Sequence, residues 1–130
     1  SATCSIAQRA AIAALDSPLT ATMSMKAAFQ KRRDLVYELI KEIPGFITNK
    51  PAGAFYFFPD VTYYFGKKHA GGTINNAEDL CMYLLTEANV AVVSGDSFGS
   101  PNNIRFSYAT TEENLKIAMQ RIKVELAKLV

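Results

Sequence analysis

This sequence has few cysteines, a single histidine and no strong excess of either charge. The two cysteines, Cys4 and Cys81, form neither a CxxC motif nor a disulfide framework, so a reducing cytoplasm is the expected location. The single histidine, His69, has no second ligand at a suitable spacing and no marked partner for a Ser/His/Asp triad, so no metal site is expected. A net charge of +2 is too small to indicate nucleic-acid binding by electrostatics.

Long apolar runs are also missing. No run approaches the roughly 20 residues that a membrane-spanning helix requires, so no membrane partner is expected. The first residues lack the charged-then-apolar layout of a signal peptide. What is present is a length of 130 residues and a hydrophobic fraction of 49%, which exclude a disordered tail and a coiled coil. We expect a single domain over residues 1–130 with one core.

Two helices are expected in the first third of the chain. Residues 6–15 are alanine-rich, which suits a helix packed closely against a neighbour. Ser17 is expected to cap a second, long helix that begins at Pro18 and ends near Glu42. Apolar residues recur along it at three- and four-residue steps, from Met25 to Ile43, and form one stripe.

The remaining elements are short strands and two further helices. A helix is expected after Asn75 or Asn76, and the last helix is expected after a capping box of Thr110 and Glu113. Strands are expected at residues 46–48, 54–58, 90–93 and 104–108. This order predicts an α+β fold: a small, mainly antiparallel sheet of about three to four short strands, with long helices packed on one face.

Arg105 is the first candidate for a functional side chain. It lies in the middle of an expected strand, where alternation puts Arg105 and Ser107 on one face and Ile104, Phe106 and Tyr108 on the other. Arginine presents a planar fork of donors that matches a carboxylate and stays charged at every relevant pH. Spacing alone favours a plain surface arginine, because most polar strand positions face solvent.

Other candidates are weaker when considered from their residues alone. The loop at residues 94–100 resembles a phosphate cradle, but no Lys-Ser/Thr pair follows it, so a tight turn is the better interpretation. Cys81 lies in a helix and is expected in the core. The aromatic run at 54–58 raises the alternative of an RNA-binding sheet, but its aromatics fall on both faces and no basic residues interleave with them.

Several segments together resemble one family, the class I/II aminotransferases of fold type I, and especially their aspartate-aminotransferase-like branch. The similar segments cover nearly the whole chain in the family's order. They are residues 8–15 (QRAAIAAL), 32–34 (RRD), 51–56 (PAGAFY), 90–99 (VAVVSGDSFG) and 104–110 (IRFSYAT). The last two in series are the most specific. One departure is small: the family often has proline where this chain has Ser94.

The resemblance implies a role for Arg105. The matching arginine of the family binds the α-carboxylate of the amino-acid or 2-oxo-acid substrate. The loop that contains Ser97 and Phe98 would shape the approach to the site, and the turn that contains Gly53 would lead into a strand near its mouth. We therefore expect Arg105 to bind substrate and Gly53, Ser97 and Phe98 to line the site.

A larger departure concerns the cofactor, pyridoxal phosphate. The family's catalytic lysine forms a Schiff base with this cofactor and belongs to a Ser-Lys segment upstream of the residues that match 8–15. Nothing in the chain matches that segment, and Lys26 lies in a helix stripe with different surroundings. The chain is therefore expected to be the C-terminal small domain of an aminotransferase, without the large cofactor-binding domain and inactive alone.

Two further readings remain open beside the aminotransferase. The first is a free-standing module that binds small carboxylates or amino acids through Arg105 without catalysis. The second is the RNA-binding sheet. The aminotransferase interpretation expects amino acids and 2-oxo acids as partners and a homodimeric full-length protein, as is typical of the family. The identity of the amino acid does not follow from the sequence.

Overall fold

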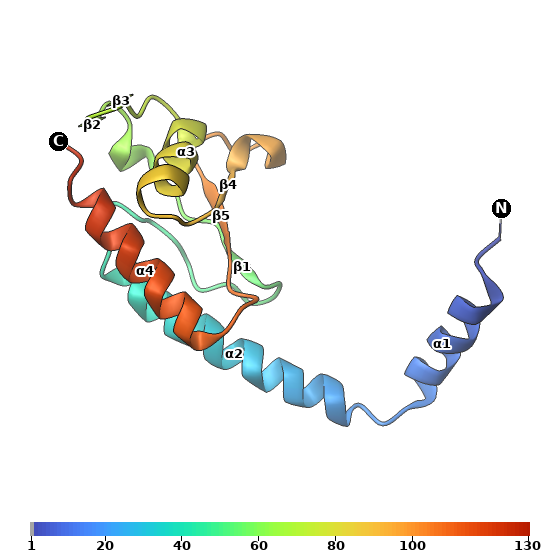
Figure 1. Ribbon diagram of the computed structural model, residues 1–130. Helices are drawn as coiled ribbons and strands as arrows, with labels where there is room; N and C mark the ends of the chain where they lie inside the picture. The colour runs from blue at the N-terminus through green and yellow to red at the C-terminus, as the bar shows by residue number, and fades with distance from the viewer. Residues whose placement is uncertain (1) are drawn as a thin grey trace.

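The computed structural model describes residues 2–130, and its elements confirm the α+β class. Their order is α1 (Ser5–Asp16), α2 (Thr20–Lys41), β1 (Tyr56–Phe57), the short 3-10 helix η1 (Thr62–Tyr64), β2 (Lys68–His69), β3 (Gly72–Thr73), α3 (Ala77–Glu87), β4 (Val93–Ser94), the short 3-10 helix η2 (Gly95–Phe98), β5 (Ile104–Ser107) and α4 (Glu112–Leu126). A three-stranded antiparallel sheet has the order β1-β5-β4, and β2 and β3 form a separate hairpin (Figure 1).

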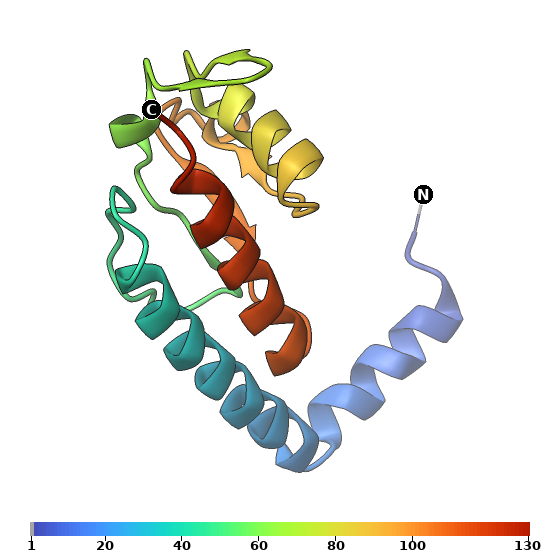
Figure 2. The same ribbon diagram turned by 60° about the vertical axis from the view of Figure 1, so that its left-hand side comes forward.

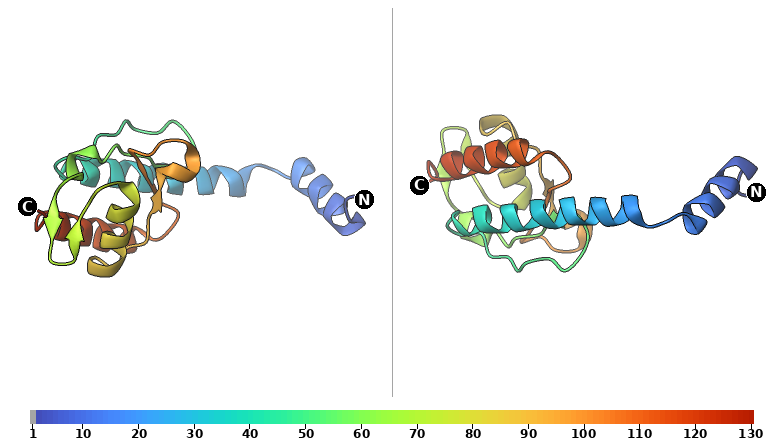
Figure 3. Two further views of the ribbon diagram at one scale, coloured as in Figure 1. Left: turned by 90° about the horizontal axis from the view of Figure 1, so that it is seen from above. Right: turned by 90° about the horizontal axis from the view of Figure 1, so that it is seen from below.

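The side chains of the central strand β5 alternate between the two faces of the sheet. Ile104 and Phe106 are buried on the face that the helices cover, and Tyr108 just beyond the strand is buried with them. Arg105 is half-buried and Ser107 is exposed on the other face, as the alternation predicted. The helices α2 and α4 lie side by side against the buried face (Figure 3). One face of the small sheet therefore belongs to the core, and the other carries Arg105.

Aromatic and aliphatic side chains join α2 to the sheet. Tyr37 of α2 stacks on Phe57 with ring centroids 6.3 Å apart, and Phe29 packs against Tyr108 at the same centroid distance. Val36 and Ile40 of the same helix are fully buried. The predicted apolar stripe is thus buried only in the second half of α2, where the sheet lies beside it.

The first helix does not pack as its composition predicted. Within residues 2–130, α1 has no buried residue, and it stands apart from the rest of the chain beyond the exposed first half of α2 (Figures 1 and 2). Large apolar side chains such as Ile6, Leu15 and Met25 are more than half exposed. The expected close packing was wrong for this chain, because no other described segment lies beside α1.

Some predicted helix starts move by a few residues. Ser17 does not cap α2: its hydroxyl donates back to the Ala13 carbonyl at the end of α1, and α2 begins without a side-chain cap. Asn76 caps α3 as expected, and its side chain accepts from the Asp79 N–H at 2.8 Å. Thr111 rather than Thr110 caps α4.

The predicted strands are shorter than their patterns suggested. Residues 46–48 contribute only an isolated bridge between Ile47 and Asp60, and the expected strand at 90–93 pairs only from Val93 onward. The β2–β3 hairpin falls in a stretch where no strand was expected, because two-residue strands leave no alternation to detect. Among residues 2–130, no helix is long and apolar enough to cross a membrane.

Two adjacent leucines of α3 test the position of the core. Leu84 is fully buried, whereas its neighbour Leu85 is 46% exposed. We expect Leu84→Ala to lower the free energy of unfolding by about 2–5 kcal/mol, because the change leaves a cavity in the core. Leu85→Ala is the matched control and should change it by about 0.5 kcal/mol or less. Urea unfolding measures both, and equal losses would contradict this assignment of the core.

Candidate functional site

The centre of the candidate site is the guanidinium group of Arg105. The backbone of β5 places it on the open face, opposite Val93 of β4. Its central carbon lies 5.5 Å from the ring centroid of Tyr56 and 5.0 Å from that of Phe98. None of the six ion pairs among residues 2–130 includes Arg105. A half-buried cation with aromatic neighbours and no acidic partner in the described chain can bind an external anion.

The aromatic neighbours come from the two sides of β5. Tyr56 belongs to β1, where it pairs with Ser107, so its side chain shares the open face with Arg105. Phe98 ends η2, the turn that follows β4, and half of its surface is exposed. The edge of one ring meets the face of the other in the Phe58–Phe98 pair, at a centroid distance of 6.0 Å. Tyr56 was not among the predicted site residues, although pairing residues 54–58 with 104–108 would have found it.

The turn that carries Ser97 and Phe98 uses its own backbone donors. The N–H of Gly95 donates to the Asn103 carbonyl at 2.7 Å, and the N–H of Ser100 returns to the Gly95 carbonyl at 3.0 Å. Gly99 has φ +72°, and a Cβ on Gly95 would approach the Ser100 carbonyl oxygen to 2.1 Å. Glycine is required at both positions. The turn interpretation is supported, because these donors are not free to cradle a phosphate.

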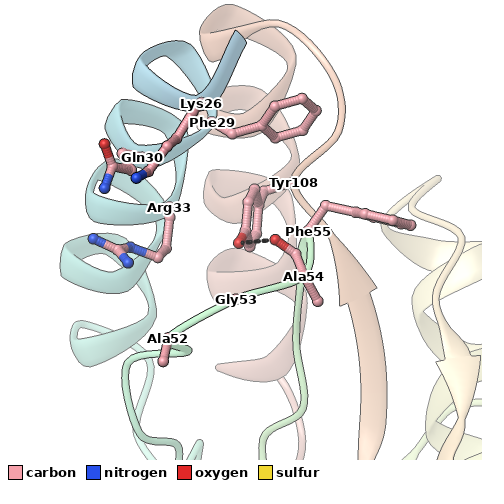
Figure 4. Close-up of a pocket in the computed structure, with 9 residues that line it drawn as sticks. All are labelled: Lys26, Phe29, Gln30, Arg33, Ala52, Gly53, Ala54, Phe55 and Tyr108. Carbon is pink, nitrogen blue, oxygen red and sulfur yellow. Dashed lines mark hydrogen bonds between the residues drawn. The ribbon is translucent and has the colours of Figure 1, made fainter. Parts of the chain in front are cut away.

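The four predicted site residues do not form one pocket. Arg105 and Phe98 are in contact, whereas Ser97 lines a separate depression beside α3 and β4. Gly53 lines a third region, a cavity of about 350 Å³ between α2 and the loop that leads into β1. Figure 4 shows its lining residues, with Arg33 and Lys26 on one side and Tyr108 facing them.

The cavity around Gly53 is held together by hydrogen bonds. The Tyr108 hydroxyl donates to the Ala54 carbonyl at 2.8 Å (Figure 4). This bond fixes a residue with φ +62°, a conformation that is unusual for alanine. Arg33 donates to the Asp34 carboxylate at 2.9 Å and to the Pro51 carbonyl at 3.2 Å, so its guanidinium is already engaged. Lys50 and Arg33 both bond to that carboxylate and lower the pKa of Asp34.

Nucleophile and metal chemistry find little support in the described residues. Burial raises the pKa of the Cys81 thiol to about 12, which keeps it protonated and unreactive. The His69 ring packs edge-on against Tyr83 at a centroid distance of 4.7 Å, and its Nδ1 accepts from the Gly71 N–H. No group of three His, Cys, Asp or Glu side chains among residues 2–130 could hold a metal ion.

Comparison with known families gives one match over most of the chain. The family model described as aminotransferase class I and II matches residues 1–122. A bifunctional aspartate aminotransferase and glutamate/aspartate-prephenate aminotransferase of Petunia hybrida is 44% identical over an alignment that covers 96% of this chain. An aspartate/prephenate aminotransferase of Cereibacter sphaeroides is 45% identical over an alignment that covers 97% of this chain. The chain spans only 27% and 32% of the lengths of these two relatives.

Solved structures agree with the family match. The aspartate aminotransferase of Rhizobium meliloti superposes with a TM-score of 0.90 at 40% identity, covering 96% of this chain and 32% of that one. The aspartate aminotransferase of Thermotoga maritima gives a TM-score of 0.82 at 32% identity, covering 98% and 30%. At these identities the similarity extends to the sequence as well as the fold.

The two cysteines test the exclusion of thiol chemistry. Cys4 is exposed and Cys81 is buried with a raised pKa. We expect a disulfide reagent at pH 8 to modify Cys4 readily and Cys81 at least about 100-fold more slowly, because only the thiolate reacts. Absorbance of the released thiol measures both rates, and Cys4→Ser isolates the slow one. Fast modification of Cys81 in the folded Cys4→Ser variant would restore it as a candidate nucleophile.

Proposed function

The chain belongs to the aminotransferase class I and II family, and from that premise we propose that it supplies the substrate-carboxylate anchor of a pyridoxal-phosphate-dependent aminotransferase. The full-length protein exchanges an amino group between an amino acid and a 2-oxo acid. The observation that carries the proposal is Arg105, a half-buried cation on the open face of the sheet without an acidic partner in the described residues. Its role is to hold the α-carboxylate of the substrate.

The chemistry of the two substrates suits such an anchor. An amino acid and a 2-oxo acid differ at Cα but share the α-carboxylate, so one arginine serves both halves of the exchange. A guanidinium group donates two parallel N–H bonds to a carboxylate and thereby fixes its orientation as well as its position. Holding the carboxylate in this way orients the bonds at Cα for the reaction.

The described residues do not fit covalent attachment of pyridoxal phosphate. The nine lysines are all exposed or half-buried, and five of them form surface ion pairs. Lys26 borders the cavity near Gly53, but it is exposed on α2, and Arg105 is not among the residues that line this cavity. We therefore assign the cofactor to a part of the full-length protein beyond this chain, and we derive no step of the reaction through it.

The exposed apolar side chains support a role as one of two domains. Those of α1 and of the first half of α2, including Leu15 and Met23, have no cover in the described chain. A large domain packed against them would remove this apolar surface from water. Closure of the small domain over the site would then exclude water around the carboxylate bound to Arg105.

Two broader features complete the proposal. We place the full-length protein in the cytoplasm, which agrees with the free thiols of Cys4 and Cys81. We also propose that it is a homodimer, as the family resemblance implies. Relatives named aspartate aminotransferases make aspartate the first amino acid to test as a substrate.

The carboxylate anchor is tested by Arg105→Lys in the full-length protein. Lysine keeps the charge but loses the planar fork, so we expect KM to rise by roughly 100-fold for both the amino acid and the 2-oxo acid. Arg121→Lys on the exposed face of α4 is the matched control and should leave KM unchanged. Steady-state kinetics with aspartate and a 2-oxo acid measure both variants. An unchanged KM in Arg105→Lys would rule out the anchor.

The alternative function, a free-standing carboxylate-binding module, gives a different result in the isolated chain. The aminotransferase proposal expects aspartate to bind the 130-residue chain too weakly for calorimetry, because the rest of the pocket lies elsewhere. Micromolar binding that Arg105→Ala abolishes would favour the module instead. Arg121→Ala again controls for the loss of one positive charge.

A further inference from the structure

We propose that Tyr56 and Phe98 are positioning residues that hold the Arg105 guanidinium between their rings while leaving its N–H donors available for the substrate carboxylate. This inference rests on the proposed function and adds two residues to it. The term aromatic clamp denotes Tyr56 and Phe98 together. Both ring centroids lie within 5.5 Å of the guanidinium carbon.

Opposite sides of the strand supply the two rings. β5 is the middle strand of the order β1-β5-β4, so its neighbours approach Arg105 from different directions. Tyr56 comes from β1, and Phe98 comes from the turn directly after β4. A clamp from both sides restricts the swing of a long side chain that would otherwise sample many rotamers. Arg105 is thereby held over the open face before any ligand arrives.

The chemistry of the contact explains why the clamp is aromatic. An acidic partner would occupy the same N–H donors that a substrate carboxylate needs. Arg33 illustrates that case, since its guanidinium already bonds to the Asp34 carboxylate at 2.9 Å. A ring face instead attracts the cation through its quadrupole and takes no conventional hydrogen bond. The clamp therefore fixes Arg105 without competing with an anionic ligand.

The rings of the clamp are themselves supported. The edge of one ring meets the face of the other between Phe98 and Phe58 and between Tyr56 and Phe55, at centroid distances of 6.0 and 6.2 Å. The Asn103 side-chain amide donates to the Phe58 carbonyl at 2.9 Å and ties the segment before β5 to the one after β1. The clamp thus rests on a built framework, in which even the half-exposed Phe98 has a fixed neighbour.

The first experiment measures the clamp itself by NMR of the 130-residue chain. Ring currents should displace the Arg105 Nε–H and Cδ proton resonances, and Phe98→Leu should return them toward ordinary arginine values. Phe98→Tyr keeps the ring and should preserve the displaced shifts. Tyr63→Leu is the matched control, because Tyr63 is a half-exposed aromatic with Lys67 rather than Arg105 above its ring. Identical Arg105 shifts in the Leu and Tyr variants of Phe98 would overturn the clamp.

The second experiment measures its consequence in the full-length protein. We expect Phe98→Leu to raise KM for both the amino acid and the 2-oxo acid by about three- to tenfold, with kcat changed less than about twofold, and Phe98→Tyr to restore KM. If Arg105→Lys raises KM and Phe98→Leu does not, the clamp is wrong and the anchor stands. If Arg105→Lys has no effect, the proposed function fails whatever the NMR of the clamp shows.

Discussion

The alternation of side chains along β5 is the constraint on which the rest of the molecule depends. Ile104 and Phe106 must face the helices, because the core is built on them, and this direction leaves Arg105 on the opposite face. A slip of one residue in the register would bury the guanidinium and expose the apolar side chains. The same strand register therefore buries the core side chains and places Arg105 on the open face. A stable sheet thus also fixes the orientation of Arg105.

The surroundings of Arg105 then decide what the charge can do. Five lysines and Arg33 are paired with acids, as Lys123 is with Glu42 and Lys31 with Glu112. The neighbours of Arg105 are rings, which restrain the guanidinium but do not satisfy its donors. Arg105 does not line the cavity near Gly53, and Arg33 of that cavity is already bonded to a carboxylate and a carbonyl. The open face of β5 is therefore the stronger candidate for carboxylate binding.

Sequence patterns predicted the features that depend on local repetition. The faces of β5, the cap of α3 and the helical extent of α2 follow from alternation, an asparagine cap and a 3.6-residue period. The environment of α1 could not be predicted, since helix propensity does not say what lies beside a helix. The contact between Tyr56 and Arg105 depends on strand register across more than forty residues of chain. The two-residue hairpin strands carry no period at all.

The family match and the exposed surfaces of the chain both indicate that Arg105 is one part of a larger site. The chain spans about a third or less of the relatives with which it was compared, and its exposed apolar helix faces agree with an uncovered domain surface. The most direct test is a crystal structure of the full-length protein with a 2-oxo acid bound. We expect the α-carboxylate to accept two N–H bonds from Arg105, at about 2.7–2.9 Å. A carboxylate held by other groups, with Arg105 turned to solvent, would contradict it.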